Sequence, residues 1–286
     1  MLVNLKTILE DARENKYAVG SFNMLSLETV RGAIKAAEEM NSPIIIQLAE
    51  VHLPAAPIEY MAPIMLEAAK RAKVPVCVHF DHGTSIESVK IALEYGFSSV
   101  MFDGASYPFE DNVRITKQVV ELAHSKGATA EAELGQVGGA EDGNTRVEAS
   151  ITNVEEAEQF VKETGVDALA VSIGNLHGEY KQPPTLRFDR LHELKNVISI
   201  PIVLHGGSGI SQEDFKRTIK SGICKVNIAT ALQLSSSNHI KFAFENTVGK
   251  LSYFSIMDAI IEGTCESVKE HMRIFGSEGR TIYNHK

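Results

Sequence analysis

The sequence lacks the features that mark several common classes of protein. It has no run of about eighteen apolar residues that could cross a membrane, and its first residues lack the charged-then-apolar plan of a signal peptide. It has no low-complexity tract, so we do not expect disorder. Positive charge is in deficit, because 28 Lys and Arg residues face 37 Asp and Glu residues and give a formal net charge of −9. This charge disfavours nucleic acid and anionic membranes as partners, and an anionic ligand would need a local binding site.

Cysteine is also scarce. The three cysteines, Cys77, Cys224 and Cys265, are odd in number, far apart, and set in apolar strand or helix patterns. Such a set is typical of reduced, buried thiols, and it argues against a disulfide framework and against a cysteine metal site. We therefore expect a cytoplasmic protein.

What the sequence does contain is an alternation of short β-rich runs with segments of helical period. With 286 residues and 44% hydrophobic side chains, the chain can bury a substantial core. The eight runs are 17–23, 43–49, 74–81, 97–103, 128–134, 167–173, 200–206 and 223–229. Segments between them, such as 27–40 and 85–96, carry apolar residues at three- and four-residue spacing.

This alternation predicts a parallel sheet that is covered by helices on its outer face. Eight such units within about 230 residues match a closed (β/α)8 TIM barrel, and we expect a single domain of residues 1–286. An open, doubly wound α/β sheet is the alternative. The stretch SFNMLS after the first run lacks the glycine fingerprint of that fold, which weakens the alternative.

Polar residues collect at the carboxyl ends of the predicted strands. The set is Asn23, Glu50, Asp81, His82, Asp103, Glu133, Asn175, His177, His205 and Asn227. The opposite ends open with Tyr17 or with a proline such as Pro43, which are plain structural starts. Barrel chemistry is carried on the carboxyl-end face, because loops there vary while the strands hold their positions. We therefore expect the functional site on this face.

Three histidines follow three different predicted strands. His82, His177 and His205 lie far apart in sequence, but a closed barrel brings them to one mouth. Three imidazoles with an open fourth position make a catalytic site for zinc or a similar divalent metal. The sequence has no local ligand spacing such as HExxH, so the alternative is that each histidine is a hydrogen-bonded pocket residue without metal. The other seven histidines, including His79, receive no role.

Asp81 and His82 stand side by side at the end of one strand. Neighbours in extended chain point to opposite faces, so both reach the mouth only if the pleat breaks at His82-Gly83. The glycine makes such a break feasible. This strand end is therefore predicted to deliver two polar side chains to one site.

Further carboxylates follow in the segment EAELGQVGGAEDG. Glu131 and Glu133 share a face of the fifth predicted strand, and a glycine-rich loop then carries Glu141 and Asp142. Carboxylates inside a barrel are costly unless they meet a cation or hydrogen-bond donors, and a nearby metal would supply that compensation. Spacing alone leaves Glu141 and Asp142 as solvated loop charges, and Asp103 as a cap of the following segment.

The last pattern is a candidate anion site. HGGSG (205–209) follows the seventh predicted strand and NIAT (227–230) follows the eighth, where barrels often bind phosphate on backbone N–H groups. Glycines allow the backbone to approach a ligand closely, and the hydroxyls of Ser208 and Thr230 could add donors. Glycine-serine loops are also ordinary turns, so this pattern gains weight from its position beside His205.

Taken in order, the motifs YAVGSFN, HFDHG, VMFDGAS, EAELGQVGGAED, SIGNLHGEYK, VLHGGSGI and CKVNIAT resemble the class II, zinc-dependent ketose-bisphosphate aldolases. The likeness runs from about residue 1 to the closing IFGSEGR. It implies a (β/α)8 lyase of carbohydrate metabolism, dimeric or tetrameric. Such an enzyme cleaves a ketose phosphate, such as fructose or tagatose 1,6-bisphosphate, into dihydroxyacetone phosphate and an aldehyde.

The resemblance also implies roles for individual residues. Zn²⁺, or another divalent metal, would be held by His82, His177 and His205. Asp81 would exchange a proton with the C4 hydroxyl, and Glu141 would move the proton of the enediolate carbon. These roles agree with the physical demand of the reaction, since cleavage leaves a carbanion beside a carbonyl that a Lewis acid must polarise.

Two more sets follow from the resemblance. Asp103 and Glu133 match carboxylates of a second or alternative metal position, and a monovalent cation (Na⁺ or K⁺) would lie near the phosphate. The residues expected around the dihydroxyacetone phosphate part are Gly178, Lys181, Gly206, Gly207, Ser208, Asn227, Ile228, Ala229 and Thr230.

Departures from the family pattern bear on the substrate. Where many relatives have Ser or Thr as a phosphate contact, this chain has Ala49 followed by Glu50. After NIAT, Ala231 and Gln233 stand where relatives often show an acidic and a basic residue. Segment 245–255 lacks the Asp-Pro-Arg stretch whose arginine meets the far phosphate, and Lys250 is a candidate substitute. The hypothesis is that the aldehyde half lacks a phosphate or carries another group.

Three other functions are compatible with such a chain. A Schiff-base aldolase would use a strand lysine, and Lys225, which has no obvious partner in the sequence, is the candidate. A non-catalytic sugar-phosphate-binding barrel is disfavoured because Asp81, Glu141 and the histidines are all present. Metal-assisted hydrolysis would use the same ligands but leaves the phosphate site unexplained.

Overall fold

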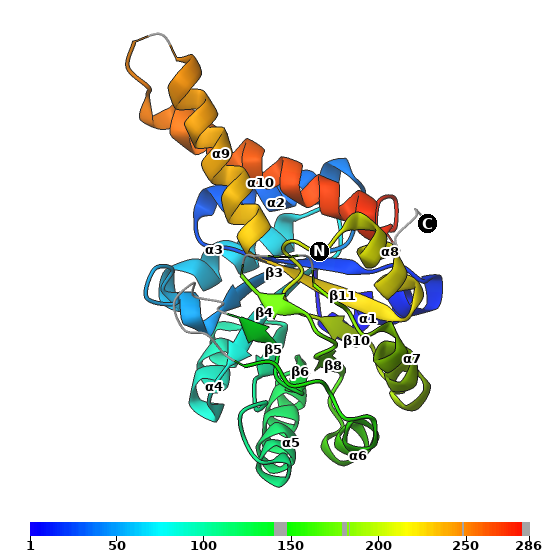
Figure 1. The fold of residues 1–286 in the computed structure, drawn as a ribbon. Coiled ribbons are helices and arrows are strands. Elements are labelled where there is room, and N and C mark those ends of the chain that lie inside the picture. The colour runs from blue at the N-terminus through cyan, green and yellow to red at the C-terminus, as the bar shows by residue number, and fades with distance from the viewer. Residues whose placement is uncertain (140–147, 179–181, 183, 248, 282–286) are drawn as a thin grey trace.

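The computed structural model describes residues 1–139, 148–178, 182, 184–247 and 249–281. Within this part, nine strands form one parallel sheet in the order β1-β4-β3-β2-β11-β10-β8-β6-β5, and pairing of β4 with β5 closes it into a barrel (Figure 1). The strands of the barrel are β2 (Val19–Asn23), β3 (Ile44–Ala49), β4 (Val76–Gly83), β5 (Ser99–Phe102), β6 (Thr129–Leu134), β8 (Ala168–Val171), β10 (Ile202–Leu204) and β11 (Ile223–Ile228). The predicted closed (β/α)8 barrel is confirmed.

Shorter strands lie outside the barrel wall. β1 (Leu2–Val3) pairs with the start of β4. β7 (Gly138–Gly139) and β9 (Leu176–His177) pair with each other in parallel, beyond the ends of β6 and β8. The β7–β9 pair fixes the backbone that carries His177.

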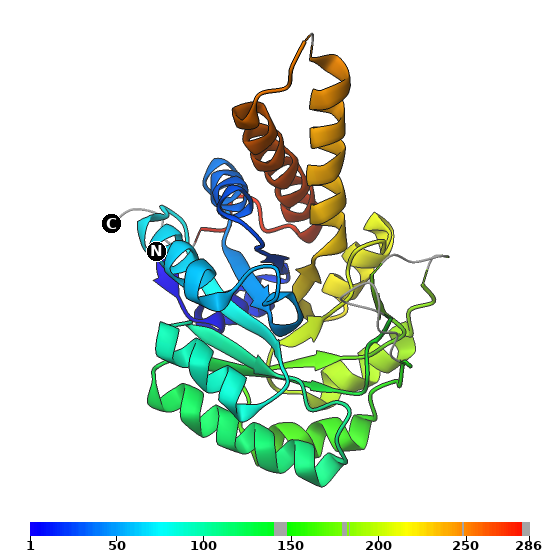
Figure 2. The same ribbon diagram turned by 90° about the vertical axis from the view of Figure 1, so that its left-hand side faces the viewer.

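Helices surround the barrel (Figures 1 and 2). They are α1 (Leu5–Asn15), α2 (Leu27–Glu39), α3 (Ile58–Arg71), α4 (Ile86–Tyr95), α5 (Phe109–Ser125), α6 (Val154–Thr164), α7 (Phe188–Val197), α8 (Gln212–Lys220), α9 (Thr230–Asn246) and α10 (Tyr253–Phe275), with a short 3₁₀ turn η1 (Glu50–His52). None of the helices in the described part of the chain has an apolar stretch that could span a bilayer.

Helix α2 illustrates why these segments are helical and which face they bury. Ser26 caps its first turn in a reciprocal hydrogen-bonded box with Thr29. Val30, Ala33 and Ala37 then fall on one buried face. That face packs on the sheet, and the same pattern in the other helices produces the apolar layer between helices and barrel.

The barrel interior changes from apolar at its closed end to polar at its mouth. Helix α1 covers the closed end, where Leu5 and Leu9 pack with inward-facing strand residues such as Val19 and Ile45. Inward positions alternate along each strand, so the next inward residues are two positions further on. There the buried residues are Ser21, Gln47, His79, Ser99, Glu131 and Lys225. The barrel interior is therefore apolar only at its closed end, and a buried polar layer lies between that end and the mouth.

Helices α9 and α10 extend beyond the barrel as an antiparallel hairpin, which we call the arm (Figures 1 and 2). The large hydrophobic side chains exposed on it are Leu234, Phe242, Phe244, Tyr253 and Phe254. The lower half of α10 packs instead on α2 and β2, where Val268, Met272 and Phe275 are buried. The arm is thus anchored in the core at one end and apolar on its surface at the other.

Candidate active site

The three predicted histidines converge at the mouth of the barrel. His82 lies at the end of β4, His177 ends β9, and His205 follows β10. The ring centroid of His82 is 5.0 Å from that of His177 and 4.6 Å from that of His205. The centroids of His177 and His205 are 6.0 Å apart. One ring nitrogen from each lies within 4.8 Å of the others, which is a spacing that a single metal ion can bridge.

The backbone at His82 departs from the strand. His82 has a positive φ of 49°, and the β4–β5 register shifts between Phe80 and Gly83. Asp81 and His82 can therefore both face the mouth, although neighbours in a regular strand point to opposite sides. A side chain at Gly83 would come within 2.6 Å of the Met101 carbonyl oxygen, so glycine is needed for this close approach to β5.

Two carboxylates, one partly and one fully buried, orient two of the rings. Asp103 Oδ2 lies 2.8 Å from His82 Nδ1, and Glu131 Oε1 lies 2.9 Å from His205 Nε2. An ionised carboxylate only accepts, so each contacted nitrogen carries the proton and the coordinating lone pair is on the opposite nitrogen. Burial, followed by the charges of His82 and His205, holds the pKa of His177 well below its usual range. A neutral imidazole is the form that binds metal.

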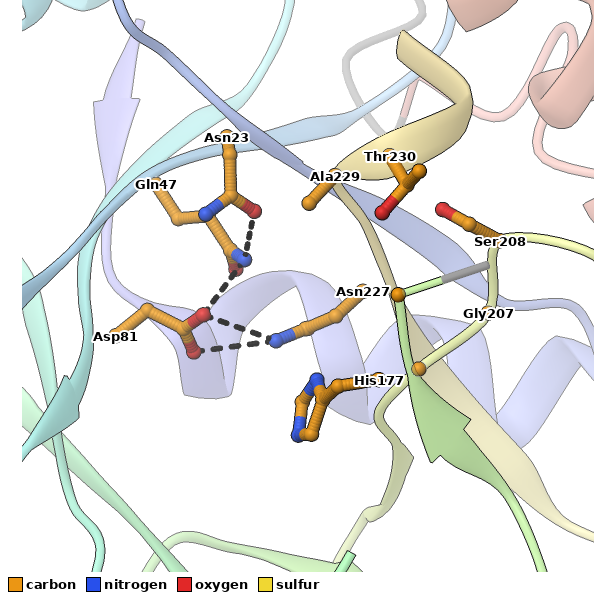
Figure 3. A pocket seen from close by; sticks show the side chains of 11 residues that line it. Asn23, Gln47, Asp81, His177, Gly207, Ser208, Asn227, Ala229 and Thr230 are labelled. Atoms are coloured by element: carbon orange, nitrogen blue, oxygen red, sulfur yellow. Dashed lines mark hydrogen bonds between the residues drawn. The ribbon is translucent and has the colours of Figure 1, made fainter. Parts of the chain in front are cut away.

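Asp81 lies across the pocket from His177 and is held by amide donors (Figure 3). Gln47 Nε2 donates to Oδ2 at 2.8 Å, and Asn227 Nδ2 lies 3.1 and 3.2 Å from the two oxygens. Burial opposes ionisation, but His82 and then His79 outweigh it and hold the pKa of Asp81 well below its usual range. Asp81 is therefore a fixed, ionised carboxylate that can accept a proton from a bound hydroxyl.

Glycines shape the opposite wall of this pocket. Gly206 has a φ of 63°, and a side chain there would come within 2.1 Å of the Leu176 carbonyl oxygen. A side chain on Gly207 would come within 2.8 Å of the Asn227 carbonyl oxygen. These two positions require glycine, and they leave backbone exposed to a ligand.

The start of α9 completes this wall. Ser208 Oγ accepts from Ala231 N at 3.0 Å, and the hydroxyls of Ser208 and Thr230 face each other at one end of the pocket (Figure 3). The residues that line the pocket are Asn23, Gln47, Asp81, His177, Gly178, Gly206, Gly207, Ser208, Asn227, Ala229 and Thr230. Backbone N–H groups at a helix start attract anions. Ile228 instead packs in the outer core, so only its backbone is placed to contribute.

The comparisons with known proteins agree with this geometry. A family model described as "Fructose-bisphosphate aldolase class-II" matches residues 3–280. The chain belongs to the class-II fructose-bisphosphate aldolase family. It is similar to a sulfofructosephosphate aldolase from Alkalicoccus urumqiensis, at 39% identity over 277 residues and 96% of either chain. It is also similar to a fructose-bisphosphate aldolase from Geobacillus stearothermophilus, at 38% identity over 287 residues and 98% of either chain.

Among solved structures, the YdjI aldolase from Escherichia coli K12 matches with a TM-score of 0.89 and 34% sequence identity. The match covers 98% of this chain and 100% of that one. The resemblance that the motifs indicated is thus confirmed across the whole chain, and this member of the class-II aldolase family is a lyase.

The class-II aldolase family is metal-dependent, and the buried groups of this member fit a metal. His205 Nδ1 and Glu133 Oε2 lie 3.2 Å apart, yet neither has a hydrogen-bond partner among the described residues. Burial and the nearby charge of Asp103 raise the pKa of Glu133, because two ionised carboxylates so close together repel each other. A cation beside Asp103, Glu133 and the histidines would satisfy these atoms, and His82, Asp103 and Glu133 form a second ligand-like group.

Several residues in the site of this aldolase had no role in the sequence analysis. Gln47 donates to Asn23 Oδ1 at 2.6 Å as well as to Asp81, and its polarity within the apolar run PIIIQLA was the available signal. His79, assigned no role, lies 2.9 Å from Ser99 Oγ. The interpretation that Lys225 lacks a partner was wrong, because its Nζ lies 2.9 and 2.8 Å from the two carboxylate oxygens of Glu131.

Other predicted residues are placed elsewhere or lie outside the described part of the chain. Glu50 Oε2 accepts from Thr84 N at 2.5 Å and from Ser88 Oγ at 3.0 Å, at the start of α4. Its carboxylate therefore ties η1 to the turn before α4, whose N-cap is Ser85, and this contact gives a structural role to a residue that departs from the family pattern. Glu141 and Lys181 lie outside the described residues, so their predicted roles stay predictions.

Proposed function

We propose that this chain is a zinc-dependent aldolase that reversibly cleaves a ketose phosphate into dihydroxyacetone phosphate and an aldehyde. The observation that carries the proposal is a cluster of three imidazoles at the barrel mouth, one of which, His177, lines a pocket together with Asp81 and a glycine-rich wall. The substrate is a ketose bisphosphate such as fructose or tagatose 1,6-bisphosphate, or a different ketose 1-phosphate. In this proposal the protein is a single aldolase domain of residues 1–286.

In this proposal His82, His177 and His205 hold the metal, with Asp103 and Glu133 as an alternative position. When bound, the metal supplies a Lewis acid that polarises the carbonyl and stabilises the charge left by carbon–carbon cleavage. Zinc suits the site because neutral imidazoles are its usual catalytic ligands. A monovalent cation, Na⁺ or K⁺, is proposed beside the bound phosphate.

The side chains around the reacting carbons then divide the work. Asp81 takes the proton of the C4 hydroxyl, because it is ionised and held in place by Gln47 and Asn227. Asn227 Oδ1 is buried and has no partner among the described residues, so it can accept a hydrogen bond from a substrate hydroxyl. Glu141 is proposed to transfer the proton at the enediolate carbon.

The phosphate is proposed to bind at the far wall of the pocket. The backbone N–H of Ser208 and the first turn of α9 offer donors, and the Thr230 hydroxyl adds one more, while Gly206 and Gly207 let the phosphate approach the backbone closely. The Gly178 backbone lines the same wall, and Lys181 is proposed to add a positive charge. In this proposal the phosphate lies at one end of the substrate, and the scissile bond lies between Asp81 and the histidines.

A Schiff-base mechanism is disfavoured by the surroundings of Lys225. Its ammonium is fully buried and forms a two-pronged ion pair with Glu131. A protonated, paired amine is not a nucleophile, so an imine would require breaking this contact. The metal-dependent mechanism needs no such rearrangement.

A substrate panel tests the proposed reaction. Metal-loaded protein is incubated with fructose and tagatose 1,6-bisphosphates and with ketose 1-phosphates that lack the second phosphate, and the products are identified. We expect dihydroxyacetone phosphate from every substrate that is cleaved. We also expect at least one monophosphate to be cleaved as efficiently as the bisphosphates, because Ala49 and Glu50 replace the usual phosphate contacts. A strong preference for the bisphosphates would contradict this second expectation.

We further propose that the protein is a cytoplasmic homodimer or homotetramer. All three cysteines are free and buried, as expected in a reducing compartment. The arm supports self-association, because Phe242, Phe244, Tyr253 and Phe254 are between 67% and 75% exposed. Large aromatic side chains that are this exposed are typical of protein interfaces.

The double substitution Phe242→Ser and Phe254→Ser is expected to lower the molar mass of the particle in solution. Removing two apolar anchors weakens an interface without touching the barrel core. Light scattering after size exclusion, at several protein concentrations, measures the mass. The control is Tyr60→Ser, which changes an equally exposed aromatic residue on α3. An unchanged mass in the double variant would place the interface elsewhere.

A further inference from the structure

A buried ion pair spans the barrel beneath the histidine cluster. Glu131 on β6 and Lys225 on β11 are both fully buried, and two strands, β10 and β8, separate their own strands in the sheet. Their side chains therefore meet across the interior of the barrel. Lys225 is the one fully buried lysine in the described part of the chain. A pair in this position requires an explanation, because the residues just below it are apolar.

Stability alone is a weak explanation. Removing two charges from water costs about as much as their mutual attraction returns, and apolar residues of similar size often replace such pairs without loss. The neighbouring layer, with Ala170 and Val203, shows that apolar side chains fit this part of the barrel. The pair is therefore better explained by what else it contacts.

Glu131 shares one oxygen between Lys225 and His205. Its Oε1 lies 2.9 Å from Lys225 Nζ and 2.9 Å from His205 Nε2. The lysine fixes the position and the charge of the carboxylate, and the carboxylate fixes the proton on Nε2 of the ring. The remaining ring nitrogen, Nδ1, then points toward Glu133, at 3.2 Å from its Oε2.

We propose that Glu131 and Lys225 form a positioning pair that sets the ring orientation and the tautomer of His205 for metal binding. This inference rests on the proposed metal centre. Asp103 does the same for His82 with a partly exposed carboxylate, at 26%. For His205 the orienting carboxylate is fully buried and needs its own counter-charge, which Lys225 provides. A residue with this role acts through the ligand rather than on the substrate.

Metal affinity is the measurement that separates this role from a structural one. Metal-stripped wild type, Glu131→Gln and Lys225→Met are titrated with Zn²⁺ against a competing chelator. The same proteins are loaded with Co²⁺, whose visible absorption reports the ligand set. Glu131→Gln is expected to weaken Zn²⁺ binding by about 10- to 100-fold, as loss of a partner of a ligating histidine usually does, and to change the Co²⁺ spectrum.

Each single substitution leaves a buried charge or amide without its partner and can prevent folding. The double variant Glu131→Gln with Lys225→Met removes both charges and keeps the volume. It is expected to unfold near the wild-type midpoint while binding Zn²⁺ about 10- to 100-fold more weakly. The matched control is Asp167→Asn at the opposite end of the barrel, where the carboxylate accepts from Ala130 N and His124. It is expected to lower stability but not metal affinity.

Wild-type affinity and an unchanged Co²⁺ spectrum in the folded double variant would overturn the inference and reduce the pair to a structural contact. Failure of the wild type itself to bind a divalent metal is a separate outcome. That result would overturn the proposed metal centre, and this inference with it.

Discussion

Replacing Asp81 with alanine is expected to leave the metal bound while cleavage falls by roughly 10²- to 10⁴-fold, the usual range for a positioned acid or base. The reason is geometric. Asp81 is held by Gln47 and Asn227 on the side of the pocket opposite His177, and the three histidines remain intact (Figure 3). Steady-state cleavage rates and metal content of the same preparation test the two parts of the prediction.

The control for Asp81 is Asp189→Ala. Asp189 is an exposed carboxylate at the start of α7 that pairs with Arg187, so its loss should change neither quantity. Near-normal turnover in Asp81→Ala would remove its assigned role. Loss of metal in that variant would instead assign Asp81 to the ligand set.

Replacing His82 with alanine is expected to abolish bound metal and turnover together. His82 is central in the cluster, since its ring lies closer to His177 and to His205 than those two lie to each other. Two imidazoles alone give an incomplete catalytic site. Metal content is measured by elemental analysis after dialysis, and turnover is measured on the same sample with and without added Zn²⁺.

A chelator should reproduce this loss in the wild type, and added Zn²⁺ should restore activity there but not in His82→Ala. The matched control is His124→Ala, a partly exposed histidine on α5 at the closed end of the barrel. Full metal retention by His82→Ala would show that the ion binds elsewhere. Activity that survives complete chelation would revive the Schiff-base alternative.

The repeated strand and helix periods were sufficient to predict the fold. Seven of the eight predicted runs contain their observed strands, and β4 extends past its run to Gly83. Most strands begin one or two residues later than predicted, as β2 does at Val19 rather than at Tyr17. Convergence of His82, His177 and His205 also followed from the fold, because barrel closure brings the carboxyl ends together. The metal-binding and catalytic roles of these residues stay predictions until they are measured.

Contacts inside the barrel could not be predicted in the same way. Whether Lys225 meets Glu131 depends on the tilt and stagger of strands that are not neighbours in the sheet, and sequence spacing does not encode that geometry. The bridging role of Gln47 depends instead on the register of β3 with its neighbours β2 and β4, which the spacing within one strand does not give. Glu50 shows the converse case, because its carboxylate, which the sequence placed at the rim, instead accepts a hydrogen bond from the turn before α4.

The left-handed backbone at His82 sets stability and activity against each other at a single position. A residue with a side chain gives up about 1–2 kcal/mol in that conformation, whereas glycine does not. Glycine at this position would relieve the strain and remove the imidazole in one step. A selection for thermostability alone would therefore favour a more stable but inactive barrel. Only a screen that also measures turnover would keep the histidine.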